Sequence, residues 1–583
     1  MLLLLAAGSV SNAQEAAPAG QPADDPFAHY AAAGRHLAAG EETPASAEFR
    51  TFLNLVLHQL ASATASTGHY EKAEPLFMEA IELSPDDAPL RMDYSRMLFS
   101  AAKFVPAKEQ AEKAVALQPG NPQPALLLGQ ILFQLRDLAG ARAQLERVWT
   151  QLPDFGTGYL LGKTDLMLHD EKAARDVFDS MLKNWGDTEG NHVFLGRAFS
   201  QAGYGDQAAA EFHRALEISP RGTMIHYQLG LSYLREDDGT GYAKAIPEFK
   251  AELAANPDDF YSRYMLGYIA VKQGQWNEAG IQLAHAIALR PKDIPTLLAL
   301  ADTYAATQRP TEEEQILRRA IAAAGTQSTA DVTRAHYLLG RLLVSQPGNE
   351  DAGRKELALV AEAQKHSGTV LTADARAMAA DSPLREEGAM EREASAPAPS
   401  SGPESHAADD LRARVADAYN NLGAIAGDAH DFRAAAGYFR RAQQWNPDLP
   451  GIEHNLGMAL FYSGQFREAA APLKSYVGAN AGDVAARGAL GFTLFRIEDY
   501  AGVVTCLKPI QEQMSKTPKL AFVYAASLAR TGAYDEAIPR LQAVEAVSPN
   551  SAEVHLELMQ AFKRAGKLED AAREMHAYER LRR

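Results

Sequence analysis

The amino-acid sequence predicts an all-α protein: a helical-repeat solenoid, in two arrays, in which antiparallel helix pairs stack into a right-handed superhelix. Three observations favour this fold. The same residue types recur every 34 residues along much of the chain. Each period carries small residues where two helices would meet. The chain of 583 residues is also longer than the ~250–300 residues at which a single hydrophobic core stops growing.

The period appears in prolines and alanines of the N-terminal half. Pro85, Pro119 and Pro153 stand 34 residues apart, and alanines such as Ala73 and Ala107 keep the same spacing. A run of this length predicts a repeat array whose units share one structure. In the C-terminal half the same step continues at Ala435, Ala469, Val503, Ala537 and Ala571.

Within a period, each residue type has a physical reason. The first helix carries Gly or Ala after Leu, and the second helix carries Ala one turn before a large apolar residue. Two helices approach closely only where side chains are small, and the large neighbour fills the space beside the contact. A Gly between the helices can take the left-handed conformation that ends a helix. A closing Pro separates one unit from the next.

The seventh unit shows the whole pattern: Leu266-Gly267, Gly274, Trp276, Ala279, Leu283, Ala286 and Pro291. This pattern resembles the tetratricopeptide repeat (TPR), and about fourteen units of the chain follow it. The resemblance implies helix pairs whose first helices line a concave face. It also implies a non-catalytic protein that holds other proteins.

Breaks in the period predict the domain organisation. We assign 1–13 to a signal peptide, 14–50 to an Ala/Pro-rich leader with an N-terminal cap helix, 51–366 to a first array, 367–410 to a linker and 411–583 to a second array. The arrays hold about nine and about five repeats. The linker is acidic and rich in Ala, Pro and Ser, which favours a flexible tether. Because repeats are stabilised by their nearest neighbours, we expect each array to fold alone.

The N-terminus has the features of an export signal. A short apolar run from Leu2 to Val10 is followed by Ser11 and Ala13, small residues at the positions that a signal peptidase reads. The run is shorter than the ~20 apolar residues that span a bilayer. We therefore expect an exported protein, periplasmic or secreted and of bacterial origin, that begins near Gln14. A disordered apolar tail and a membrane anchor are the alternatives.

The charge balance argues against nucleic-acid binding. Lys and Arg number 57 and Asp and Glu 74, which gives a net charge of −17. Such a chain is repelled by phosphate backbones and anionic lipid surfaces.

Motifs that carry chemistry are not found. Gly156–Thr164 imitates a phosphate-binding loop, but the glycines are wrongly spaced and no strand precedes them. The one cysteine, Cys506, cannot form a disulfide or a Cys-His zinc motif, and we expect a buried small hydrophobic residue there. We expect no catalytic site, no cofactor and no metal.

The candidate partner-binding residues lie on the first helices, two residues before the Leu-Gly landmark or one or two residues after it. Aromatic and cationic side chains there suit an extended peptide with acidic groups. The alternative is that the tyrosines pack between neighbouring first helices. The carboxylate clamp known in the family is not matched, because its Lys, Asn and Arg set is incomplete. The candidates are Tyr159, Lys163, Arg197, Tyr227, Tyr264, Tyr268 and Arg341, with Tyr337 beside the last.

Two classes of function fit these features. The first is a non-catalytic scaffold or adaptor that binds proteins or peptides. The second is a periplasmic protein that accompanies polysaccharide export and binds a glycan. An auxiliary subunit of an enzyme is a third possibility.

Overall fold

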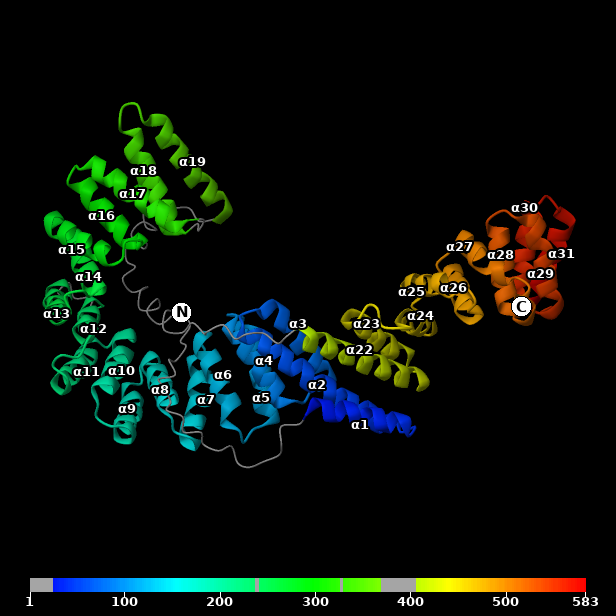
Figure 1. Cartoon of the computed structure of the whole chain (residues 1–583), viewed down its shortest axis with the longest axis horizontal. Coiled ribbons are helices and arrows are strands. Elements are labelled where there is room, and N and C mark those ends of the chain that lie inside the picture. Colours follow the sequence, from blue (N-terminus) through cyan, green and yellow to red (C-terminus); the bar gives the residue numbers. More distant parts are fainter. Residues whose placement is uncertain (1–24, 236–240, 326–328, 368–404, 583) are drawn as a thin grey trace. The chain divides into compact units, whose positions relative to one another are not determined.

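The computed structural model describes residues 25–235, 241–325, 329–367 and 405–582 (Figure 1). Within these residues it contains 29 α-helices and no strand. The predicted all-α helical-repeat solenoid is thereby confirmed. The predicted signal peptide at 1–13 and residues 368–404 of the predicted linker lie outside the described residues.

After α1 (Pro26–Ala38), the helices up to residue 367 form consecutive antiparallel pairs (Figure 1). The first helices are α2 (Glu42–Ser66), α4 (Ala88–Ser100), α6 (Pro122–Gln134), α8 (Phe155–Met167), α10 (Glu189–Gln201), α12 (Ile225–Leu234), α14 (Phe260–Lys272), α16 (Ile294–Ala306) and α18 (Ala330–Val344). The second helices are α3 (Tyr70–Leu83), α5 (Phe104–Leu117), α7 (Leu138–Gln151), α9 (Glu171–Trp185), α11 (Gly205–Ile218), α13 (Gly241–Ala255), α15 (Trp276–Leu289), α17 (Pro310–Ala324) and α19 (Glu350–Ser367).

Five further pairs follow. Residues 405–410, which we assigned to the linker, form the start of α22. In the third of these pairs the second helix is short, and a 3₁₀ turn at Lys508–Ile510 follows it, where Pro509 interrupts the helical hydrogen bonds. The pairs are α22 (Ser405–Asp428) with α23 (Phe432–Trp445), α24 (Ile452–Tyr462) with α25 (Phe466–Ala479), α26 (Val484–Arg496) with α27 (Tyr500–Leu507), α28 (Pro518–Arg530) with α29 (Tyr534–Val547), and α30 (Ala552–Arg564) with α31 (Leu568–Arg582).

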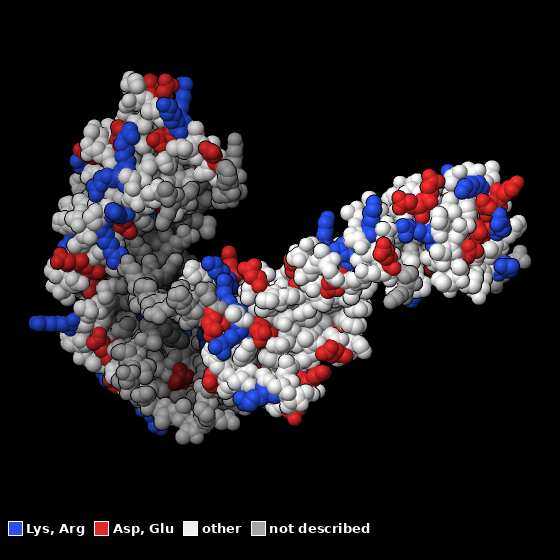
Figure 2. Space-filling view, turned by 45° about the vertical axis from the view of Figure 1, so that its right-hand side comes forward, with Lys and Arg blue, Asp and Glu red and all other residues white. Residues whose placement is uncertain are grey.

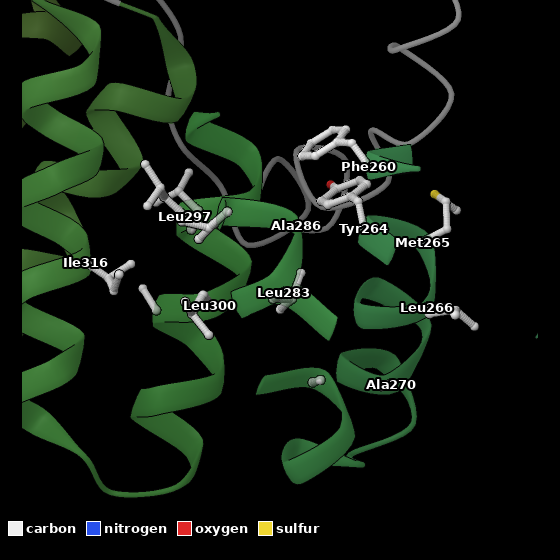
Figure 3. Packing of buried hydrophobic residues seen from close by; sticks show 14 of the residues in the cluster. Phe260, Tyr264, Met265, Leu266, Ala270, Leu283, Ala286, Leu297, Leu300 and Ile316 are labelled. Atoms are coloured by element: carbon white, nitrogen blue, oxygen red, sulfur yellow. The ribbon is translucent and has the colours of Figure 1, made fainter. Parts of the chain in front are cut away.

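A contact between a glycine and a large side chain joins the two helices of a pair. A Cβ atom added at Gly267 of α14 would lie 2.6 Å from Leu283 Cγ on α15. Leu283 is fully buried and belongs to the cluster drawn in Figure 3, between α14 and α16. The same close approach recurs between Gly196 and Phe212 and between Gly423 and Phe439. The repeat therefore needs a small residue at this position, most often glycine and in α16 Ala301, to bring its two helices together.

The turn between the two helices keeps one conformation whatever residue occupies it. Glycines such as Gly203 and Gly274 have φ of 88° and 70°. Where the sequence has no glycine, Ala102 and His430 have φ of 58° and 61°. A left-handed conformation costs roughly 1–2 kcal/mol for a residue with a Cβ atom, so packing of the two helices imposes this turn.

The described residues group into two compact units. The first contains residues 91–367, and the second contains residues 25–90 together with 405–582. In the second unit α22 packs against α2, although the two helices are far apart in the sequence. Tyr30 Oη donates a 2.6 Å hydrogen bond to Asp417 Oδ2, and Arg50 Nη2 donates one of 2.7 Å to Tyr438 Oη. Helices α1–α3 thus cover the first pair of the C-terminal array.

Two further features complete the description of the fold. Cys506 is buried, as predicted, and burial raises the pKa of its thiol to about 11. Among the described residues, no helix has the length and apolar character needed to cross a membrane.

The first prediction concerns the glycine contact. Gly267→Ala should lower the free energy of unfolding of the first unit by about 1–2 kcal/mol, because the methyl group would overlap Leu283. The matched control is Gly190→Ala, where no atom lies within 4 Å of the added Cβ. Alanine has the higher helix propensity, so the control should be neutral or stabilising by up to about 1 kcal/mol. Chemical denaturation measures both, and equal effects would contradict the contact.

The second prediction concerns the cover that α1–α3 provide. Tyr30→Phe removes a hydrogen bond to a carboxylate, an interaction worth about 1.5–3 kcal/mol. We expect faster amide hydrogen exchange in α22, measured by mass spectrometry, and no change in α8–α19. Tyr462→Phe is the control, because Tyr462 is an exposed tyrosine of the same unit. Unchanged exchange in α22 would mean that the C-terminal array stands alone, as the repeat pattern suggests.

Candidate functional site

The first helices of the first unit form a continuous surface, which we call the first-helix surface (α6, α8, α10, α12, α14, α16 and α18). Contacts join α6 to α8, α8 to α10, α10 to α12, α14 to α16 and α16 to α18. In Figure 1, α8, α10, α12 and α14 lie on the inner side of an arc, and α9, α11, α13 and α15 lie on its outer side. All seven predicted binding residues lie on these first helices.

Lys163 links three neighbouring first helices. Its ammonium group donates a hydrogen bond to the Gln201 side chain at the end of α10 and lies 5.7 Å from the centre of the Phe133 ring on α6. Tyr159, one turn earlier on α8, makes an edge-to-face contact with Phe194 on α10. Both Lys163 and Tyr159 are only 5% exposed. They position helices and offer little surface to a partner.

Tyr227 and Tyr264 lie in the hydrophobic core. Tyr227 is 1% exposed and packs on Phe249 of α13 and Tyr261 of α14. Tyr264 is 5% exposed and stacks with Phe260, with ring centres 6.2 Å apart (Figure 3). This geometry favours the packing alternative for these two tyrosines.

The other three predicted residues are more accessible. Tyr268 and Arg197 are half-buried, and Arg341 is exposed. Lys272 lies 5.3 Å from the Tyr268 ring centre, and Arg341 lies 5.7 Å from that of Tyr337. The structure therefore separates the predicted set into buried residues and residues that a partner could touch.

Two charged residues of the first-helix surface escaped prediction. Arg334 Nη2 of α18 donates a 2.6 Å hydrogen bond to Asp302 Oδ2 of α16. Burial raises the pKa of Asp302, although Arg334 acts in the opposite direction. Asp302 follows Ala301, which takes the place of the landmark glycine in α16. Neighbouring units have Tyr268 and Arg341 at the position of Asp302. Counting 34 residues on from Gly267 to Ala301 would have found it.

An ionic cluster around the buried carboxylate of Asp165 lies where α7 meets α8. Arg142 Nε is 3.1 Å from Asp165 Oδ1, and Arg142 also forms ion pairs with Glu146 and Asp170. Burial raises the pKa of Asp165 to about 6, despite the opposing charge of Arg142. The Arg142 guanidinium therefore forms ion pairs with three carboxylates. Its pair with Asp165 links α7 to α8, the helix that carries Lys163.

A recurrent pair of His and Glu was also missed by sequence reasoning. His192 Nδ1 of α10 is 2.6 Å from Glu211 Oε2 of α11, and His336 Nδ1 of α18 is 2.6 Å from Glu356 Oε2 of α19. In both cases the histidine stands four residues before the landmark glycine, at Gly196 and Gly340. Equivalent pairs are His29–Glu48, His226–Glu248 and His555–Glu574. The signal was a His followed by Glu 19 to 22 residues later.

A separate pocket of about 440 Å³ lies between α15 and α16. Its lining includes Trp276, Gly280, Ile281, Tyr304 and Arg309. None of the predicted binding residues lines it, so it is a distinct place where a ligand could sit.

Charges of both signs are interspersed on the face drawn in Figure 2. No broad basic surface is visible there among the described residues. A protein or peptide partner suits this surface better than a nucleic acid.

Comparison with known proteins agrees with the repeat pattern. Family models for the tetratricopeptide repeat match residues 56–87, 101–154 and 238–294. Superkiller protein 3 of Schizosaccharomyces pombe is 30% identical over 121 residues, which cover 21% of this chain and 8% of that protein. Anaphase-promoting complex subunit 3 of the same yeast is 22% identical over 225 residues, 38% of this chain and 33% of that protein. The chain thus matches a third or less of the length of these relatives.

A solved tetratricopeptide repeat protein from Parabacteroides merdae is 14% identical and covers 43% of this chain and 98% of that chain, with a TM-score of 0.33. In the structure, the matched segments include α2–α3 of the second compact unit, and α5–α7 and α13–α15 of the first compact unit. The family models therefore identify tetratricopeptide repeats in these three segments of the chain.

Proposed function

We propose that this protein is a non-catalytic scaffold that binds an extended, acidic peptide of a partner protein on its first-helix surface. Repeats of this type serve chiefly to bind proteins or peptides. The observation that carries the proposal is the placement of Arg197, Tyr268 and Arg341 on one series of helices, each one residue after the landmark glycine and each with exposed surface.

The chemistry of these side chains indicates the kind of peptide. Arg197 and Arg341 can each bind a carboxylate with two parallel hydrogen bonds. Tyr268 adds a large contact area with a hydroxyl group at little cost in entropy. An extended segment that carries acidic residues between apolar ones would meet these groups in turn. The buried Tyr159, Lys163, Tyr227 and Tyr264 act in this proposal by holding the helices in register.

Charge reversal tests the proposal. Three forms of the full chain are compared: the wild type, the double variant Arg197→Glu/Arg341→Glu and the control Arg318→Glu. The control changes an exposed arginine on α17, which is a second helix. Fluorescence anisotropy of a labelled peptide of alternating Glu and Leu should show binding that the double variant weakens at least tenfold and the control leaves unchanged. A matched peptide with Lys in place of Glu should not bind.

Thermal unfolding separates binding from folding. The double variant should unfold at the wild-type temperature, since both arginines have exposed surface. Peptide binding that is unchanged in the double variant would contradict the proposed surface. The pocket lined by Trp276 would then be the next candidate site. A glycan that co-purifies with the native protein, in place of a protein, would favour the polysaccharide alternative.

We also propose export, which rests on the apolar run Leu2–Val10 and the small residues Ser11 and Ala13. The protein from its native host should begin near Gln14. N-terminal sequencing checks this, and an intact Met1 would contradict it.

A further inference from the structure

Three side chains able to bind a metal ion meet at the C-terminal end of the second unit. Glu545 lies on α29, His555 on α30 and Glu574 on α31, and one ligand atom of each lies within 4.8 Å of the others. His555 Nδ1 is 2.7 Å from Glu574 Oε2 and 3.8 Å from Glu545 Oε1. In the part of the chain that the structure describes, no other group of three such residues comes as close together.

The backbone determines which nitrogen of His555 carries hydrogen. His555 Nε2 lies 3.0 Å from the carbonyl oxygen of Pro549, which can only accept a hydrogen bond. Nε2 is therefore the donor, and in a neutral ring Nδ1 presents its lone pair to the carboxylates. Carboxylate oxygens are acceptors as well, so either a proton on Nδ1 or a metal ion has to lie between these atoms.

The charge of the cluster calls for a cation in the same place. His555 is 4% and Glu574 9% exposed. In the described chain, the ion pairs of Glu545 and Glu574 are those with His555, and no Arg or Lys compensates them. Carboxylates removed from water are costly unless they are paired or bind a metal. A proton on His555 would balance one carboxylate, whereas a divalent ion would balance both.

We propose that Glu545, His555 and Glu574 bind a divalent transition-metal ion such as Zn²⁺. One imidazole nitrogen and two carboxylate oxygens are suitable ligands for zinc, and three protein ligands leave a position for water. The hydrogen bond from Nε2 to a backbone carbonyl is the outer contact that ligating histidines usually make. Ions such as Mg²⁺ and Ca²⁺ prefer oxygen ligands throughout.

The proposed ion would join three consecutive helices, α29, α30 and α31. Because such a site is absent from the unfolded chain, metal binding would stabilise the folded helices directly.

The other His–Glu pairs show what sets this cluster apart. His226 Nδ1 lies 2.7 Å from Glu248 Oε2, the same distance as in the His555–Glu574 pair. This pair lacks the second carboxylate that Glu545 supplies next to His555. It therefore serves as a matched control, because a proton on His226 is enough to balance its single carboxylate.

Calorimetric titration of the full chain with Zn²⁺ alone, after removal of metal on a chelating resin, tests the proposal at pH 7.5. We expect one site with a dissociation constant near or below 1 μM, in the range expected for a specific site. His555→Gln should abolish this site, Glu545→Gln should weaken it at least tenfold, and His226→Gln should leave it unchanged. Mg²⁺ should not compete.

Thermal unfolding gives an independent readout. Without metal, Glu545→Gln should unfold as the wild type does, because Glu545 is 3.8 Å from His555 and partly exposed. Zn²⁺ should raise the unfolding temperature of the wild type but not of Glu545→Gln. The proposal is overturned if Zn²⁺ does not bind, or if Glu545→Gln binds and responds like the wild type, since then a proton fills the cluster.

Discussion

The contact between a glycine of the first helix and a large side chain of the second is the interaction on which this structure depends. It sets the distance between the two helices of a pair, as at Gly267 and Leu283. That distance in turn determines how each pair stacks on the next, because the large residue reaches the core shared with the following first helix. The recurrence of this one contact gives the chain its solenoid form.

The positions around this contact differ in how much of a side chain a partner could touch. Three residues before the glycine, Tyr227 and Tyr264 are buried. One residue after the glycine, Lys163 is buried, whereas Arg197, Tyr268 and Arg341 retain exposed surface. Residues that look alike in the sequence, all aromatic or cationic and all near Leu-Gly, therefore have different structural environments.

Much of the fold could be predicted because it depends on local spacing. The repeat of small and large residues along the chain specifies helix pairs without any knowledge of distant contacts. The left-handed conformation of Ala102 and His430 was harder to predict from the sequence, because neither residue prefers it. Packing of the two helices imposes it. The cover of α22 by α1–α3 could not be predicted, because Tyr30 and Asp417 are 387 residues apart and a repeat pattern describes only neighbours.

The candidate metal site also depends on contacts that spacing in the sequence does not reveal. Zinc signatures are recognised by ligands close in sequence, whereas Glu545, His555 and Glu574 come from three successive helices. The spacing of 19 residues connects His555 with Glu574, as in the other His–Glu pairs, but nothing in the sequence connects Glu545 with them. The repeat supplies the connection: stacking places His555 opposite Glu574 in its own pair and next to Glu545 of the preceding pair. In a solenoid, a site formed between adjacent pairs needs only one suitable residue in each helix. Glu545, which lies on the side of Nδ1, gives the His555–Glu574 pair the second carboxylate that the His226–Glu248 pair lacks.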